Sequence, residues 1–168
     1  MSVIHKRGNS MLIENKIEQL GYNFPESPEP LANYVTVRKH GQLLYTSGSG
    51  PIVNGKPVIQ GRVGADVTLE EAYEAARLTA VNLLSMIKNE VDDLQHIRVI
   101  KLLGFVNSSL DFYRQAEVIN GASDLLVEVL GENGKHARSA IGTSVLPFNL
   151  PVEIEMIVEV IDNNKGEN

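Results

Sequence analysis

The sequence predicts an α+β protein in which two long helices pack on one face of a single sheet. Two stretches predict the helices, because residues 67–91 and 111–131 each repeat apolar side chains at helical spacing. The sheet is predicted by five shorter segments, rich in β-branched residues, that lie before, between and after the helices. The elements follow the order helix, strand, strand, helix, strand, helix, strand, strand, which is typical of a layered α+β sandwich.

Length and composition indicate one globular domain. The chain has 168 residues, of which 43% are hydrophobic and 21% charged, and this balance can support a core. The net charge is −6 and Lys and Arg form no block, so nucleic acid is not an expected partner. The chain lacks cysteine, a signal-peptide-like segment and any apolar run near the ~20 residues that span a bilayer. We therefore expect a cytoplasmic protein with no membrane partner.

The two ends of the chain are expected to flank the main domain. Residues 1–10 are polar and precede Met11, so we expect either a flexible N-terminal extension or sequence upstream of a later start. Residues 11–30 predict a short amphipathic helix that stops at Gly21, followed by an extended proline-rich connector. Residues 163–168 predict a polar C-terminal tail.

Residues 33–66 predict a hairpin and a long loop. Residues 34–37 and 43–47 are expected to be strands joined by a turn. The Gly- and Pro-rich stretch 50–66 nearly matches a phosphate-binding loop, but Pro57 stands where that motif needs a Ser or Thr hydroxyl. We therefore expect a hairpin or lid loop here and no nucleotide site.

The two long helices carry recognisable end signals. Thr68 and Glu71 form a capping box, and Gly131 stands where the second helix is expected to end. The inward face of the first long helix is expected to consist of Leu69, Ala72, Ala76, Ala80, Leu83, Leu84 and Ile87. The inward face of the second is expected to consist of Ala116, Ile119, Leu126, Val129 and Leu130.

Three more strands are expected to complete the sheet. Residues 96–107 are mostly apolar, which predicts a central strand with both faces buried. Residues 138–147 form the next strand, and residues 152–161 alternate between an apolar face and a face that includes Glu153 and Glu155. Because acidic side chains cannot form a dry core by themselves, this second face is either solvated or shared with another subunit.

Few residues carry recognisable chemistry. The four histidines lack metal-ligand spacing and no nucleophile motif is present, so no metal site is expected. Glu153 and Glu155 either lie on a solvated face or, shielded from water, bind protons more tightly and act as an acid or base. Arg138 either lies in solvent at the end of a strand or binds a carboxylate bidentately through its guanidinium group. If a hairpin joins their two strands, Arg138 and Glu153 can face one pocket.

Several segments of the chain resemble the RidA/YjgF family. The C-terminal stretch "HARSAIGTSVLPFNLPVEIEMI" is similar to the signature of that family, and "ANYV", "LLYTSGSGPI", "EEAYEAARLTAVNLLSMI" and "VIKLLGFVNSSLDF" resemble its upstream elements. The resemblance identifies residues 31–162 as a RidA-like domain. The additional helix and connector at residues 11–30 resemble a larger subgroup of the family.

The resemblance implies a fold, an assembly and an activity. The fold is chorismate-mutase-like, and the assembly is a homotrimer whose sheets form a central barrel with sites in the clefts between subunits. The activity is the hydrolysis of reactive enamines and imines, such as 2-aminoacrylate, to 2-keto acids and ammonia. It needs no metal and no organic cofactor, and the ligand is a small carboxylate-bearing imine, enamine or keto acid.

The resemblance also implies roles for individual residues. Arg138 matches the arginine that binds the substrate carboxylate, and Glu153 matches the glutamate that positions the attacking water. Tyr34 matches an aromatic wall of the pocket, and Gly48 lies in a turn whose backbone faces the ligand. Asn120 falls where the family often has a polar helix residue.

Two further positions depart from the family pattern, and other functions stay open. Ala140 stands where many members have cysteine, at a substrate-binding position that acts through its backbone, and His136 replaces a proline or small residue. The alternative to a deaminase is a non-catalytic ligand-binding or regulatory trimer on the same fold. A chorismate-mutase-type reaction needs several cations in one pocket, where only Arg138 is clearly available, with Arg62 or Arg38 as additions.

Overall fold

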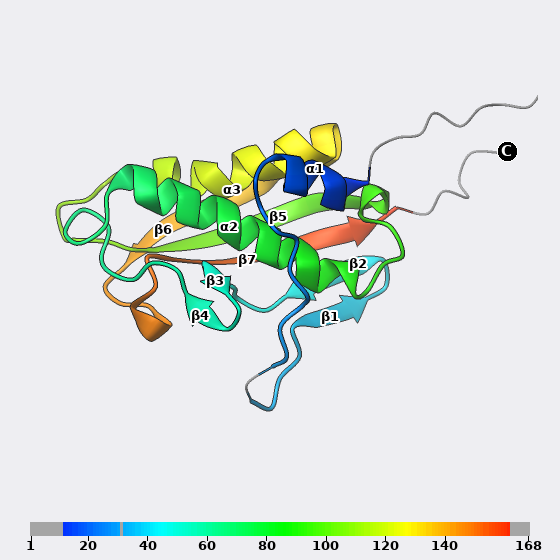
Figure 1. Ribbon diagram of the computed structural model, residues 1–168, viewed down its shortest axis with the longest axis horizontal. Helices are drawn as coiled ribbons and strands as arrows, with labels where there is room; N and C mark the ends of the chain where they lie inside the picture. Colours follow the sequence, from blue (N-terminus) through cyan, green and yellow to red (C-terminus); the bar gives the residue numbers. More distant parts are fainter. Residues whose placement is uncertain (1–11, 31, 162–168) are drawn as a thin grey trace, which may run out of the picture.

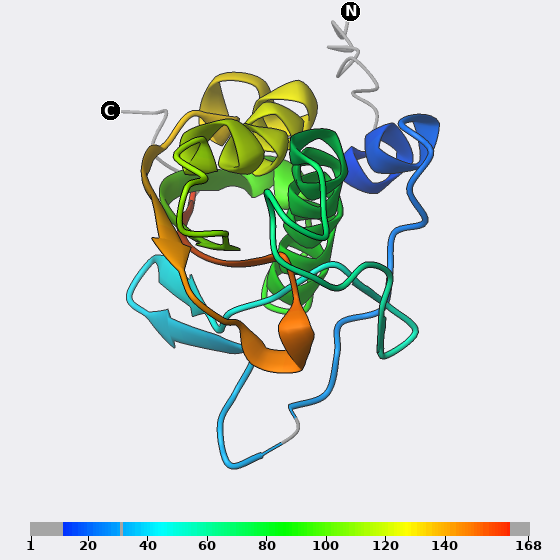
Figure 2. The same cartoon turned by 90° about the vertical axis from the view of Figure 1, so that its left-hand side faces the viewer.

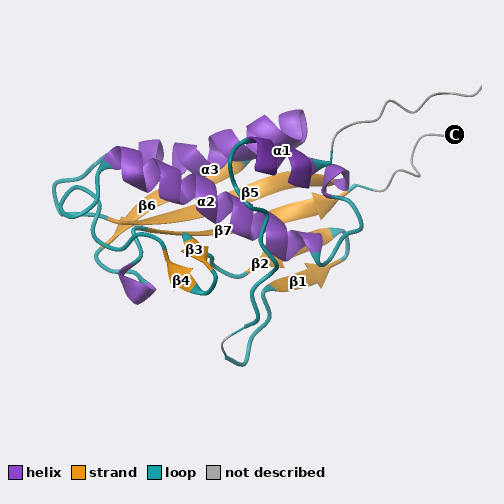
Figure 3. Ribbon diagram, in the orientation of Figure 1, coloured by secondary structure: helices purple, strands orange, loops and turns teal. Residues whose placement is uncertain are grey.

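The computed structural model describes residues 12–30 and 32–161, and it confirms the predicted α+β sandwich. Helices α2 (Leu69–Lys88) and α3 (Gln115–Leu130) cover one face of the sheet, and α1 (Ile13–Gln19) packs beside them (Figures 1 and 3). Figure 2 shows the helical layer above the sheet in a view turned by 90°. The extension predicted at residues 1–10 and the tail predicted at 163–168 lie outside the described residues.

The main sheet has five strands in the order β1-β2-β7-β5-β6. Neighbouring strands pair antiparallel except β5 and β6, which are parallel and connected through α3. The strands are β1 (Val37–His40), β2 (Leu43–Thr46), β5 (Ile97–Asn107), β6 (Ala137–Thr143) and β7 (Val152–Val160).

This strand order corrects one expectation. The strand predicted at residues 96–107 lies inside the sheet, as expected, with β7 and β6 as its neighbours. The last two strands do not form a hairpin, since β5 lies between β6 and β7. The connection through residues 144–151 is long enough to step across one strand, a distance of about 10 Å between the strands on either side of it.

The sheet buries one face under the helices and leaves the other open in a single chain. On β5, Leu102 and Val106 are fully buried, whereas Leu103 and Phe105 on the other face are only partly covered. The expectation that both faces of this strand are buried is therefore wrong for one chain. The alternation predicted for β7 is confirmed, with Val152, Ile154, Met156 and Val158 buried beneath the helices.

The predicted helix ends are confirmed. The Thr68 side chain accepts a hydrogen bond from the backbone N–H of Glu71 at 3.2 Å, and Glu71 accepts one from the backbone N–H of Thr68 at 2.9 Å. Gly131 ends α3 with φ 62°, a conformation that costs glycine little. One predicted core position is wrong: Ala116 is exposed. It lies at the start of α3, on the side that faces the edge strand β6.

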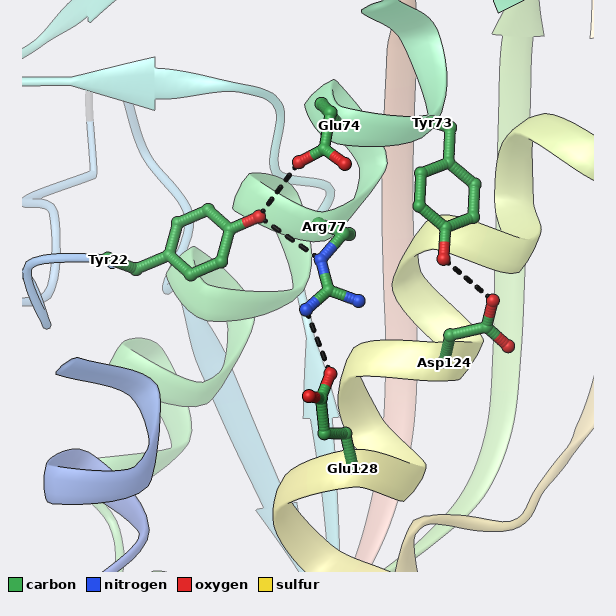
Figure 4. A network of polar contacts seen from close by, with 6 residues as sticks. All are labelled: Tyr22, Tyr73, Glu74, Arg77, Asp124 and Glu128. Carbon is green, nitrogen blue, oxygen red and sulfur yellow. Dashed lines mark hydrogen bonds and ion pairs between the residues drawn. The ribbon is translucent and has the colours of Figure 1, made fainter. Parts of the chain in front are cut away.

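The N-terminal segment is fixed to both long helices. Ile13 and Ile17 of α1 are buried, and the Lys16 ammonium donates to the Val129 carbonyl at 3.1 Å. The connector begins at a polar network over α2 and α3 (Figure 4), in which Arg77 donates to the Tyr22 hydroxyl at 3.1 Å. Arg77 also forms a 2.9 Å ion pair with Glu128 of α3. The connector, which the sequence predicts to be extended, therefore has a fixed origin on the helical layer.

The loop after β2 contains a small hairpin, as expected. Strands β3 (Ile52–Val53) and β4 (Lys56–Pro57) pair antiparallel around Asn54 and Gly55, both with positive φ. The buried Asn82 of α2 donates to the carbonyls of Gly50 and Ile52, both at 2.9 Å, and so holds the start of this hairpin against the helix.

Candidate functional site

Arg138 lies near the start of the edge strand β6, and its side chain is on the helix side of the sheet. One terminal nitrogen of its guanidinium donates to the Ser123 hydroxyl at 2.9 Å. The other donates to the Asn120 side-chain oxygen at 2.8 Å and to the Ala116 carbonyl at 3.2 Å. These three partners lie on one face of α3 because they are spaced at four and three residues.

The charge of Arg138 is not neutralised by an acidic partner. All three acceptors around its guanidinium are neutral, and no carboxylate of the described residues forms an ion pair with it. Three of the five N–H groups of the guanidinium have these acceptors, which leaves two N–H groups and the full positive charge for a carboxylate ligand. The predicted pair Arg138 and Asn120 is therefore brought together by the structure, on the same side of β6 as the partly buried Ala140.

His136 belongs to the same cluster through Ser123. Its Nε2 lies 3.0 Å from the Ser123 hydroxyl, and its Nδ1 lies 2.6 Å from the Gly134 carbonyl. Burial lowers the pKa of His136, and the charge of Arg138 lowers it further, against the opposite effect of the Gly134 carbonyl. The imidazole is therefore neutral near pH 7 and can accept a hydrogen bond.

Glu153 lies on β7, on the open face of the sheet. Its carboxylate lies directly against Gly48, where a Cβ would overlap a carboxylate oxygen, so this position has room only for glycine while Glu153 stays in place. Burial raises the pKa of Glu153, and the neighbouring charge of Glu155 raises it further. Among residues 12–30 and 32–161, no side chain forms a hydrogen bond or ion pair with this carboxylate. A half-buried carboxylate of this kind can accept a proton from water.

Tyr34 is half exposed and lies just before β1. The hydroxyl of Ser47 donates to the Val35 carbonyl at 2.7 Å, and the Ser47 backbone N–H donates to the Thr36 carbonyl at 2.8 Å. These bonds join the segment of Tyr34 to the residue before Gly48. The backbone segment that contains Tyr34 therefore lies beside the segment that contains Gly48.

The six predicted site residues fall into two groups within one chain. The first, which we call the arginine half-site, consists of Arg138, Asn120 and Ala140. The second, the glutamate half-site, consists of Glu153, Gly48 and Tyr34. The expectation that Arg138 and Glu153 face one pocket from adjacent strands is wrong for a single chain, because β5 lies between their strands and the two side chains are on opposite faces.

Two residues that adjoin the arginine half-site, Ser123 and His136, were not assigned from the sequence. Ser123 lies on the partly buried side of α3, and its role depends on how that helix crosses β6, which no local pattern reveals. The position of His136 could have been inferred from the sequence, since side chains two residues apart in an extended chain point to the same side, and His136 stands two residues before Arg138.

No group of three or more metal-ligating side chains occurs among the described residues.

The five-stranded sheet covered on one face by two long helices defines a class of protein: the chorismate-mutase-like α+β proteins. Within this class, the family described as "YjgF/chorismate_mutase-like, putative endoribonuclease" matches residues 14–160, so the chain belongs to this family. In the part of the chain that the structure describes, no helix has the length and apolar character needed to cross a membrane.

Two relatives support this membership. Protein TCP17 of Trypanosoma cruzi is 40% identical over 146 residues, which cover 86% of this chain and 91% of that protein. The crystal structure of Atu1372 from Agrobacterium tumefaciens, a protein whose function is described as unknown, superimposes with a TM-score of 0.84 at 49% identity. That match covers 88% of this chain and 92% of the other.

Proposed function

We infer that this protein hydrolyses reactive enamines and imines of the 2-aminoacrylate type to 2-keto acids and ammonia. The observation that supports this proposal is a pair of unmatched charges. Arg138 is an oriented cation without an acidic partner among the described residues, and Glu153 is a half-buried carboxylate whose pKa is raised. A substrate that carries a carboxylate and reacts with water uses both groups.

The proposed chemistry needs only these two groups and water. Arg138 binds the substrate carboxylate, which fixes the imine carbon in one place. The enamine first tautomerises to the imine, and a water molecule then attacks the imine carbon while Glu153 accepts a proton from it. That proton passes to the nitrogen, which gives a carbinolamine. The carbinolamine hydroxyl then loses its proton, which Glu153 passes to the same nitrogen, and the carbon–nitrogen bond breaks as the carbonyl forms, so that ammonia leaves the keto acid. Each turnover consumes one water and needs no metal or organic cofactor.

The proposal includes a cyclic homotrimer in which neighbouring subunits complete each site. Exposed apolar side chains on the sheet, including Tyr45, Ile100 and Ile141, support an interface there. In this arrangement the arginine half-site of one subunit faces the glutamate half-site of the next. Light scattering should give about three times the 18.4 kDa mass of one chain, and a monomer in dilute buffer would contradict the assembly.

The word endoribonuclease in the family description raises RNA as a second substrate, which the composition does not favour. The chain carries a net charge of −6, whereas RNA binding relies on clustered Lys and Arg residues. We therefore keep the small carboxylate as the proposed ligand, with no nucleic-acid or membrane partner. A cytoplasmic location, where reactive enamines are released, is part of this proposal.

A coupled assay tests the activity. A pyridoxal-phosphate-dependent dehydratase generates 2-aminoacrylate or 2-aminocrotonate from an amino acid, and keto-acid release is followed with and without this protein. Faster release, abolished in Arg138→Ala, supports the deaminase. No acceleration with any amino acid, together with calorimetric binding of 2-oxobutanoate, would instead identify a non-catalytic binding protein.

A further inference from the structure

A hydrogen-bonded chain of fixed direction runs from Arg138 through Ser123 and His136 to the Gly134 carbonyl. Arg138 can only donate, so the Ser123 oxygen accepts from it at 2.9 Å. The Gly134 carbonyl can only accept a hydrogen bond. The Nδ1 of His136, 2.6 Å away, must therefore carry the proton and donate to that carbonyl. A neutral imidazole with its proton on Nδ1 has a lone pair on Nε2, and the Ser123 hydroxyl therefore donates to Nε2 at 3.0 Å.

We propose that Ser123 and His136 are positioning residues that orient the Arg138 guanidinium for the ligand carboxylate. His136 acts through Ser123: because its Nε2 accepts a hydrogen bond from the Ser123 hydroxyl, the lone pairs of that hydroxyl point at the guanidinium. Asn120 holds the other terminal nitrogen at 2.8 Å, so the guanidinium is fixed at both of its ends. This inference rests on the proposed function for its ligand, but the ordering of Arg138 is a property of the free protein.

Neutral hydrogen-bond acceptors suit a guanidinium that has to bind a ligand carboxylate. A carboxylate in place of Ser123 would also orient Arg138, but it would compete with the ligand for the same charge. Three neutral acceptors leave that charge available. The effect resembles that of a second layer of side chains around a metal ligand, where partners fix orientation without contacting the substrate.

The charged groups around His136 are consistent with a neutral imidazole. On β6, Arg138 shares the Ser123 hydroxyl with it. Beside it, Lys135 pairs with Glu132 at 2.7 Å, and Asp124, the residue after Ser123 on α3, accepts from Tyr73 of α2 at 2.8 Å. No described carboxylate forms an ion pair with His136 that would favour its protonated form.

The first test measures the order of Arg138 in the ligand-free protein. Nitrogen NMR of the guanidinium should show slow rotation of the terminal groups in the wild type and faster rotation in Ser123→Ala and His136→Leu. His136→Gln should retain part of the order, because its side-chain oxygen can accept from Ser123 while its amide donates. Ser139→Ala and His40→Leu are the matched controls and should leave Arg138 unchanged. Equal rotation in all variants would overturn the inference, whether or not the protein is a deaminase.

The second test measures the consequence for the ligand. Ser123→Ala removes one hydrogen bond to the Arg138 guanidinium and should raise the KM, and the Kd for 2-oxobutanoate, about tenfold while kcat is retained. His136→Leu should shift both constants in the same direction by less, because it acts only through Ser123. A merely structural role would lower thermal stability without this split between KM and kcat. If the wild type binds no carboxylate while the NMR result holds, the proposed function fails, and only the ordering of Arg138 by Ser123 and His136 stands.

Discussion

The side chains of Arg138 and Glu153 lie on opposite faces of one sheet, with β5 between their strands. The sheet itself therefore separates the two groups that the proposed reaction needs at one ligand. Each subunit of a ring can offer its arginine half-site to one neighbour and its glutamate half-site to the other. This relationship makes the division of the site testable by mixing inactive variants.

Mixed assemblies of two inactive variants should regain activity. If Arg138→Ala and Glu153→Gln chains are unfolded together at equal amounts and refolded, about one quarter of the sites between neighbours receive both intact residues by random assembly. Keto-acid release should then recover to about that fraction of the wild-type rate. Separately refolded variants, mixed afterwards, are the control. No recovery in the co-refolded sample would mean that each site is formed within a single chain.

Replacing Arg138 should abolish deamination and leave the fold intact. Arg138→Ala removes the contact to the substrate carboxylate, which should cost on the order of 2–5 kcal/mol, or roughly 30-fold to several thousand-fold in kcat/KM. Arg138→Lys should restore little, because a single ammonium cannot reproduce the planar fork. Circular dichroism and light scattering report the fold and assembly. Loss of either one in step with the activity would indicate a structural arginine.

Replacing Glu153 should separate turnover from binding. Glu153→Gln keeps the size of the side chain but cannot accept a proton, so kcat should fall while the Kd for a keto acid changes little. Glu155→Gln, on the same strand and exposed, is the matched control and should retain turnover. A large loss in Glu155→Gln, or none in Glu153→Gln, would assign the proton transfer elsewhere.

Glu153→Gln should also stabilise the fold at neutral pH. Burial raises the pKa of Glu153, so the folded state binds this proton more tightly than the unfolded state and ionisation costs stability. That cost is present above the raised pKa and disappears as the pH falls toward the ordinary value of about 4.3. Denaturant unfolding should therefore find Glu153→Gln more stable than wild type at pH 7, with a difference that shrinks on acidification.

Gly48→Ala should impair activity although it replaces no charged residue. The added Cβ would overlap the end of the Glu153 side chain, which is flexible and can move away, so the free energy of unfolding should change little. The displaced carboxylate should lower kcat at least tenfold, because small misplacements of a catalytic group are costly. A wild-type kcat in Gly48→Ala would show that the position of the Glu153 carboxylate is not critical.

Local patterns predicted most elements but not the way they join, and the first strand lies at Val37–His40, three residues later than expected. The capping box at Thr68, the stop at Gly131 and the alternation in β7 depend on neighbours in sequence, and all three are confirmed. The strand order depends on long-range pairing. The short connection between β6 and β7 favoured a hairpin, whereas β6 pairs parallel with β5 through the crossover of α3. Sequence proximity is therefore a poor guide to this sheet.

The residues of the candidate site were also easier to predict from the sequence than their arrangement in space. Arg138 and Glu153 were identified by their residue types and by the family resemblance. Their separation was not, because it follows from the strand order. Ser123 was missed, since a serine on a helix carries no signal until the helix is placed over the strand that holds its partner. His136 was noted only as a departure from the family pattern, and its tautomer depends on the Gly134 carbonyl.

The central position of β7 has a consequence during synthesis. The strand that joins the two sides of the sheet is the last of the five to leave the ribosome. Until residues 152–160 emerge, the β1–β2 hairpin and the β5–β6 pair are separate fragments, each with a strand edge that lacks its partner. Completion of the sheet thus waits for the end of translation, and the nascent chain is most prone to aggregate just before its final strand arrives.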